Sequence, residues 1–221
     1  RQQQERLRAA FGTGFDPAAL DTPETRGALL DALVSQRLLA NAAATAGGLY
    51  VLIVLFGPLS GAHFNPAVTM VMRANGERLP APVFAYIAVQ FVAAIVGVGV
   101  AHAMFGEPFW QPGDHVRTGL AQWFSEGVAT FGLLLTILLG AQHRPRAIPA
   151  LVAAYIFAAY WFTASTSFAN PAVTLARAFT QTFAGIRPAD VGGFVVAQMI
   201  GALTAWGMAK LLLPSGYRDR A

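Results

Sequence analysis

The sequence Asn-Pro-Ala-Val-Thr occurs twice in this chain, at residues 65–69 and at residues 170–174. An asparagine amide can donate a hydrogen bond to the oxygen of a passing water or alcohol while its carbonyl accepts one from nearby backbone. The alternative is that each asparagine only caps the helix that follows it. Because two matched copies are present, we expect both asparagines to face a path for small polar solutes. The motif residues are Asn65, Pro66, Ala67, Asn170, Pro171 and Ala172.

Each copy of the motif is expected to begin a short helix. Proline suits the first position of a helix, where its missing N–H leaves no hydrogen bond unmade, so Pro66 and Pro171 predict helix starts. The apolar stretches that follow, residues 67–72 and 172–179, are too short to cross a hydrocarbon core of about 30 Å. The sequence therefore predicts two half-helices.

Longer apolar runs surround these half-helices. Hydrophobic residues make up 55% of the chain and charged residues 12%, and the mean hydropathy is positive, as is typical of an integral membrane protein. Runs long enough to span a membrane lie near residues 36–57, 82–105, 119–141, 147–166 and 190–213. Close approaches between these helices are expected at Gly97, Gly99, Gly201 and Gly207. The fold class is an all-α membrane protein with five clear spans.

The two halves of the chain are related beyond the motif itself. The segment YIAVQFVAAIVG after the first copy resembles FVVAQMIGALTA after the second, and places Gln90 and Gln198 at matching positions. Basic residues in the loops, judged by the positive-inside rule, put the C-terminus in the cytoplasm. The first half-helix then enters from the cytoplasm and the second from outside, which is an inverted-topology repeat. Their N-termini are expected to meet near the midplane and to repel cations there.

The segment GPLSGAHFNPAVT, together with the second copy of the motif, resembles the aquaporin and aquaglyceroporin superfamily, the major intrinsic proteins. The resemblance covers roughly residues 36–213. It implies a homotetramer in which each protomer holds its own pore for small uncharged solutes such as water and glycerol. It also implies that Glu126 braces the loop of the second half-helix and that His63 lines the cytoplasmic vestibule. Alternatively, the His63 nitrogens only satisfy nearby backbone.

The pore constriction is where the sequence departs from that family. Most members resemble one another in having an arginine after the second Asn-Pro-Ala, and here that position is Val173. The resemblance places the rest of the constriction at Thr45, Ala158 and Ser167, which are all small. A planar, charged donor is thereby replaced by a short hydrocarbon, which predicts a wider filter with fewer hydrogen-bond donors. Arg177 lies one turn further along the half-helix, where it either charges the outer vestibule or snorkels to the lipid headgroups.

A polar segment occupies residues 1–35, where the family has its first membrane helix. It has no apolar run of about 18 residues, and DPAALDTPETRG predicts a turn and a short amphipathic helix. The expected organisation is this segment, a channel domain over residues 36–213 and a cytoplasmic tail over residues 214–221. The segment lies at the membrane interface, or a neighbouring subunit fills the gap in the wall, or the gene is damaged.

Several classes of function are excluded by composition and motifs. The chain has no cysteine, no metal-ligand spacing of histidines and carboxylates, no nucleophile elbow and no P-loop, so we predict no metal, no cofactor and no enzyme. Scattered basic residues predict membrane lipid and not nucleic acid as a partner. We expect a passive channel in a bacterial inner membrane, with arsenous acid favoured because an aliphatic residue at position 173 resembles channels associated with arsenic resistance. A degenerate, non-conducting interaction protein and a coupled secondary transporter are the alternatives.

Overall fold

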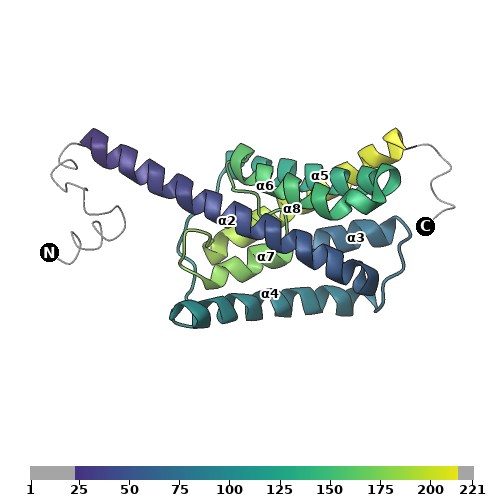
Figure 1. Cartoon of the computed structure of the whole chain (residues 1–221), viewed down its shortest axis with the longest axis horizontal. Coiled ribbons are helices and arrows are strands. Elements are labelled where there is room, and N and C mark those ends of the chain that lie inside the picture. Colours follow the sequence, from purple (N-terminus) through teal and green to yellow (C-terminus); the bar gives the residue numbers. More distant parts are fainter. Residues whose placement is uncertain (1–22, 214–221) are drawn as a thin grey trace. The chain divides into compact units, whose positions relative to one another are not determined.

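A computed structural model describes residues 23–213 of the chain. Within them five helices are long and apolar enough to cross a membrane, as predicted. They lie in α2 (Pro23–Ser60), α4 (Val83–Phe105), α5 (Leu120–His143), α6 (Ile148–Phe162) and α8 (Val191–Leu212), which are labelled in Figure 1. The chain divides into two compact units after Ala43, so that the first part of α2 belongs to one unit and all later helices belong to the other.

Helix α2 differs from the prediction at its start. Residues 23–27 of the predicted short amphipathic helix are the first residues of α2, which continues without a break through the expected boundary at residue 35. Proline at the helix start and the Ala, Leu, Gln and Arg residues that follow favour one continuous helix. The membrane-spanning part of α2 begins at Asp31. The rest of the predicted N-terminal segment and the predicted tail lie outside the described residues.

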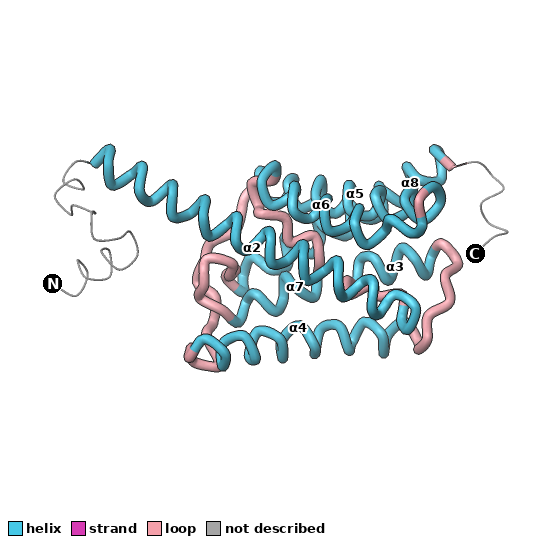
Figure 2. Tube along the Cα trace, viewed as in Figure 1, coloured by secondary structure: helices cyan, strands magenta, loops and turns pink. Residues whose placement is uncertain are grey.

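The two half-helices are confirmed. They are α3 (Pro66–Ala74) and α7 (Pro171–Ala176), and α7 is followed by a 3-10 turn, η3 (Arg177–Phe179). Each begins at the proline of the motif after an extended residue, with φ of −153° at Asn65 and −158° at Asn170. Figures 1 and 2 show α3 and α7 lying end to end among the longer helices, with their first turns facing each other.

The most extensive helix packing in the described chain is between α5 and α8. A Cβ atom at Gly201 would collide with the backbone of Gly127, so glycine is required for the two helices to approach this closely. Gly99 is close to the ring of Phe109, which lies in the loop after α4 and not on another helix, and Gly97 and Gly207 face open space, so these three do not fit the prediction. Large apolar residues elsewhere on α8 point outward, and Leu211 is 82% exposed, as suits a helix that contacts lipid.

Gly201→Leu is expected to lower the free energy of unfolding by about 1–3 kcal/mol, because the added side chain must push α8 away from α5. Thermal unfolding of the detergent-solubilised protein, followed by size-exclusion chromatography, measures this loss. Gly207→Leu on the same helix is the matched control and is expected to change stability by less than about 0.5 kcal/mol. Equal melting temperatures for the two variants would show that the α5–α8 contact tolerates a side chain.

Candidate functional site

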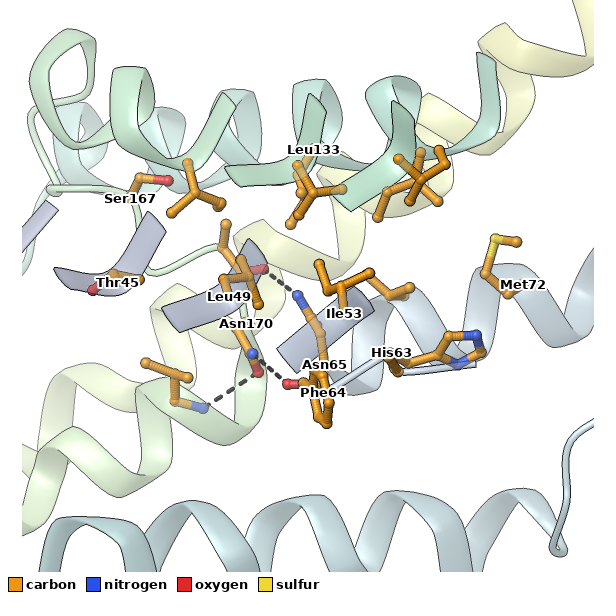
Figure 3. Close-up of a pocket in the computed structure, with 18 of the residues that line it drawn as sticks. Thr45, Leu49, Ile53, His63, Phe64, Asn65, Met72, Leu133, Ser167 and Asn170 are labelled. Atoms are coloured by element: carbon orange, nitrogen blue, oxygen red, sulfur yellow. Dashed lines mark hydrogen bonds between the residues drawn. The ribbon is translucent and has the colours of Figure 1, made fainter. Parts of the chain in front are cut away.

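The two motif asparagines bind each other's loops. The amide nitrogen Nδ2 of Asn65 donates to the carbonyl of Ala169 over 2.7 Å, and Nδ2 of Asn170 donates to the carbonyl of Phe64 over 2.8 Å. These reciprocal bonds cross the junction of the two half-helices and are drawn in Figure 3. They bring together the two copies of the motif, whose asparagines, Asn65 and Asn170, are 105 residues apart in the sequence.

Each asparagine also caps its own half-helix. The Asn65 carbonyl Oδ1 accepts from the N–H of Ala67 over 3.0 Å. The Asn170 Oδ1 accepts from Ala172 over 2.9 Å and from Val173 over 3.3 Å. Capping and contact between the halves therefore coexist, and each Nδ2 carries a second hydrogen that can serve a solute oxygen.

The loops that enter the half-helices hold a repeated backbone strain. Phe64 and Ala169, one residue before each asparagine, have φ of 48° and 47°, and Ala62 and Ser167, three residues before, have φ of 49°. This left-handed conformation is unfavourable for residues other than glycine and persists only where surrounding contacts impose it. The reciprocal asparagine bonds hold the carbonyls of Phe64 and Ala169 in place, and at Ala169 the hydrogen bond from its N–H to Glu126 adds a second constraint.

Glu126 on α5 supports the second of these loops. It is fully buried, and its two carboxyl oxygens accept hydrogen bonds from the N–H groups of Phe168 and Ala169, each over 2.8 Å. Gln198 on α8 donates to the same carboxyl group over 2.6 Å and to the Thr174 hydroxyl over 2.8 Å. The loop and the half-helix are thus fixed to both α5 and α8.

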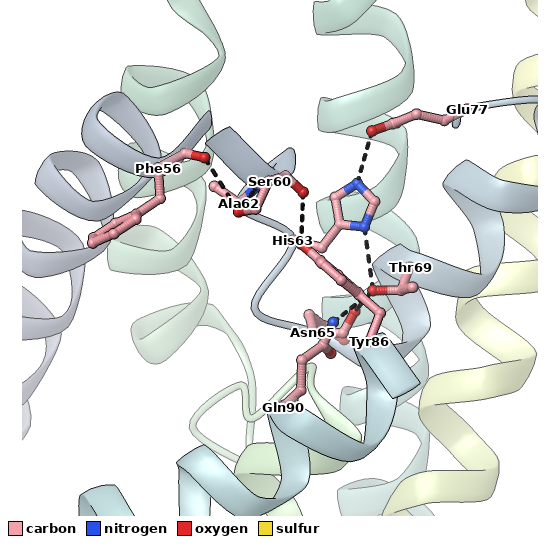
Figure 4. Close-up of polar contacts among 9 residues, drawn as sticks. All are labelled: Phe56, Ser60, Ala62, His63, Asn65, Thr69, Glu77, Tyr86 and Gln90. Atoms are coloured by element: carbon pink, nitrogen blue, oxygen red, sulfur yellow. Dashed lines mark hydrogen bonds and ion pairs between the residues drawn. The ribbon is translucent and has the colours of Figure 1, made fainter. Parts of the chain in front are cut away.

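The first half-helix has a related polar cluster (Figure 4). Gln90 on α4 donates to the Thr69 hydroxyl over 2.8 Å, as Gln198 does to Thr174, and Thr69 donates to the Asn65 carbonyl. His63 places one ring nitrogen 3.2 Å from the Thr69 hydroxyl and the other 3.2 Å from the carboxylate of Glu77. The His63 nitrogens therefore contact side chains and not the broken backbone, and Glu77 joins the site without having been singled out from the sequence.

A cavity of about 450 Å³ runs past both asparagines. Figure 3 shows Thr45 and Ser167 on one side of the asparagine pair and His63 and Met72 on the other. The predicted constriction residues Thr45, Ser167 and Val173 line it, as do both predicted vestibule residues, His63 and Arg177. In residues 23–213 no three His, Cys, Asp or Glu side chains lie close enough together to hold a metal ion.

The fourth predicted constriction residue, Ala158, is not in the cavity lining and is exposed on α6. Tyr160, two residues further along α6, lines the cavity in its stead. Its hydroxyl lies 3.2 Å from the Thr45 hydroxyl and accepts a hydrogen bond from Arg177 over 3.0 Å. The placement of Ala158 by its offset from Asn170 therefore identified the helix but chose the wrong face, since two residues turn an α-helix by about 200°.

Arg117 lies in the loop between α4 and α5 and is not singled out in the sequence analysis. It is buried, and its guanidinium donates to three backbone carbonyls, those of Ser165, Phe183 and Gly185, over 2.8–3.1 Å. Burial, and then the charge of nearby Arg177, lower the pKa of Arg117 to about 10. The side chain is therefore still charged at neutral pH, and it ties the loop before α7 to the loop after it.

Comparisons with known proteins agree with this architecture. Residues 18–164 match the family described as Major intrinsic protein. The chain is 51% identical over 207 residues to Aquaglyceroporin AqpS of Rhizobium meliloti (strain 1021), which covers 92% of this chain and 88% of that protein. It is 29% identical over 144 residues to the Glycerol uptake facilitator protein of Bacillus subtilis (strain 168), covering 58% of this chain and 52% of that protein. With Probable aquaporin PIP2-8 of Arabidopsis thaliana it shares 34% identity over 115 residues, 48% of this chain and 41% of that protein.

The chain belongs to the major intrinsic protein family. Proteins of this family are channels and not enzymes, so the predictions of family, fold class and absence of catalysis are confirmed. The chain is accordingly an integral membrane protein of the kind that carries small solutes.

Proposed function

We propose that this protein is a passive channel for small uncharged solutes, with arsenous acid and glycerol as its main permeants and water as a lesser one. The observation that carries the proposal is the cavity past the asparagine pair, whose wall holds the small side chains of Thr45, Ser167 and Val173. A solute that is wider than water needs this room. The same space would be narrowed by a charged arginine side chain at position 173, and Val173 leaves it open.

Arsenous acid fits these demands as a chemical species. It is neutral at physiological pH and resembles glycerol in its bulk and in its display of hydroxyl groups. The second N–H groups of Asn65 and Asn170 can donate to those hydroxyl oxygens as the solute passes. The names of two relatives, an aquaglyceroporin and a glycerol uptake facilitator, support solutes of this size class.

We assign the parts of the site as follows. The asparagine pair and its alanines and prolines form the centre of the pore. Thr45, Ser167 and Val173 form the constriction, with Tyr160 in the place predicted for Ala158. His63 lies in the cytoplasmic vestibule and Arg177 in the outer one, and the supporting residues are Glu126, Gln90 and Gln198.

The protein is further proposed to lie in a bacterial inner membrane with its C-terminus in the cytoplasm, and to assemble as a homotetramer. Residues 36–213 would form the channel domain, residues 1–35 a segment distinct from it in composition, and residues 214–221 a tail. Helices α2 and α4 expose large apolar side chains that suit contact with lipid or with a neighbouring subunit. Leu55 on α2 is 59% exposed, and Val89 on α4 is 66% exposed.

Stopped-flow light scattering on proteoliposomes tests this function, with an impermeant osmolyte, glycerol and arsenous acid applied in turn. Val173→Arg is expected to lower glycerol and arsenous acid permeability by at least about tenfold, a change of roughly 1.4 kcal/mol in the barrier, while water still passes. Val173→Thr, which keeps the size of the side chain, is the matched control and should retain both solutes.

Two other outcomes would contradict the proposal. If the native protein does not raise permeability above that of empty liposomes despite verified insertion, it is a non-conducting member of its family. If solute flux follows an imposed proton or sodium gradient, it is a coupled transporter.

A further inference from the structure

Arg177 is the one Arg or Lys side chain that lines the cavity in the described part of the chain. It is the first residue of η3, directly after the second half-helix and four residues beyond Val173, and it lies at the same end of the cavity as Tyr160 and Thr45. The remaining wall at this end is small or apolar. Arg117 also lies over the Phe168 ring but does not line the cavity, so the positively charged side chain that a solute can contact there is Arg177.

The position of Arg177 is fixed by its neighbours. One nitrogen, Nη2, donates to the Tyr160 hydroxyl over 3.0 Å, and that hydroxyl lies 3.2 Å from the Thr45 hydroxyl. The guanidinium carbon lies 4.2 Å from the centre of the Phe168 ring, a cation–π contact with a side chain that is 4% exposed. A side chain held in this way does not snorkel to the lipid headgroups, which was the alternative that the sequence allowed.

Hydrogen-bond donors remain on Arg177. A guanidinium has five N–H groups. Within residues 23–213, the Arg177 guanidinium makes one hydrogen bond, to the Tyr160 hydroxyl, so its other N–H groups can donate to a solute. Arg117, the other arginine over Phe168, is not available in the same way, because three backbone carbonyls occupy its guanidinium. The two arginines thus divide the work: Arg117 holds the loops and Arg177 faces the cavity.

A second polar group, the Ser167 hydroxyl, lies at the same end of the cavity. Ser167 is 3% exposed and lines the cavity, and its hydroxyl has no hydrogen-bond partner in the described residues. A buried hydroxyl that makes no hydrogen bond is unfavourable unless a bound molecule supplies the missing partner. A solute hydroxyl passing Ser167 supplies that partner, and the Arg177 N–H groups supply donors to the solute's oxygens.

We propose that Arg177, held by Tyr160 and assisted by the Ser167 hydroxyl, is the specificity-determining residue of this channel. It excludes cations by its charge and favours neutral solutes that carry several hydroxyl groups, while Val173 provides the width. This inference rests on the proposed channel function and adds to it the residue that selects the solute.

The test compares native protein with Arg177→Leu, Arg177→Lys and Ser167→Ala in proteoliposomes. Arg146→Leu, at an exposed arginine in the 3-10 turn Pro145–Ala147, is the matched control. Two readouts are taken: the glycerol-to-water permeability ratio, and proton leak by an entrapped pH-sensitive dye. We expect Arg177→Leu to raise the proton leak about tenfold or more and to lower the permeability ratio several-fold.

Arg177→Lys should keep the proton leak low, because it keeps the charge, but should lower the ratio, because a single ammonium cannot bind Tyr160 and a solute in the same geometry. Ser167→Ala should lower the ratio alone. Should Arg177→Leu fail to fold, the lysine and alanine variants still carry the test.

Native conduction with unchanged ratio and leak in all three variants would overturn the assignment of Arg177 and leave the channel function intact. An absence of conduction in the native protein would overturn both.

Discussion

Glu126→Gln is expected to abolish solute conduction and to lower the free energy of unfolding by several kcal/mol. The carboxyl group is fully buried and accepts from the N–H groups of Phe168 and Ala169 and from Gln198. A glutamine amide has the same shape but replaces one acceptor by two donors. At least one buried N–H then faces another donor, and each such group left without an acceptor destabilises by roughly 1–3 kcal/mol.

The loss should reach the pore because of what this loop carries. Ala169 has φ of 47° and presents its carbonyl to Asn65, so the hydrogen bond between the two half-helices depends on the loop's strained shape. Without Glu126, the backbone can relax toward a more favourable conformation and draw that carbonyl away. The junction of the half-helices would then open or close irregularly.

Thermal unfolding and stopped-flow glycerol flux measure the two effects of Glu126→Gln. Glu107→Gln, the same substitution in an exposed loop, is the control and should leave both unchanged. A Glu126→Gln protein with native melting temperature and native flux would mean that the loop keeps its shape through the asparagine bonds alone.

The parts of the site that could be predicted from the sequence are those governed by short-range chemistry. Pro66 and Pro171 predicted helix starts because proline restricts φ and lacks an N–H, and both helices begin there. Asn65 and Asn170 precede those prolines, so their capping contacts follow from local geometry. The five spans follow from hydropathy, which depends on composition and not on contacts.

The parts that could not be predicted depend on which faces of distant segments meet. Ala158 and Tyr160 lie on the same helix, and only the packing of α6 decides that Tyr160 turns toward Thr45 and Arg177. Glu77 reaches His63 across a loop, and Arg117 reaches carbonyls far along the chain. In a sequence with many loop charges, nothing local distinguishes these from charges that face water.

The boundary at residue 35 illustrates a different limit. Hydropathy separates a polar segment from an apolar one, but an α-helix can continue across that change, because its hydrogen bonds are made within the backbone. Helix α2 does so from Pro23 to Ser60, although the membrane-spanning part begins at Asp31. Composition therefore predicts where the membrane span lies, whereas the residue at which the helix begins is seen only in the structure.

Arg117→Met is expected to lower the free energy of unfolding by roughly 3–5 kcal/mol, because three hydrogen bonds from a charged donor are lost together. The carbonyls concerned are those of Ser165, Phe183 and Gly185, which lie on both sides of the second half-helix. Methionine fills a similar volume but donates nothing, so these buried carbonyls would be left without a partner. Thermal unfolding of the purified protein measures the change.

Arg117→Lys separates charge from geometry. An ammonium keeps the charge but cannot reach the three carbonyls that a planar guanidinium spans. The free energy of unfolding of Arg117→Lys should therefore lie between those of the native protein and Arg117→Met. Arg78→Met, in an exposed loop, is the control and should be close to native. If lysine restores full stability, the charge over the Phe168 ring, 4.9 Å from its centre, is what matters. If lysine is as unstable as methionine, the fork of hydrogen bonds holds the loops, and the charge contributes little.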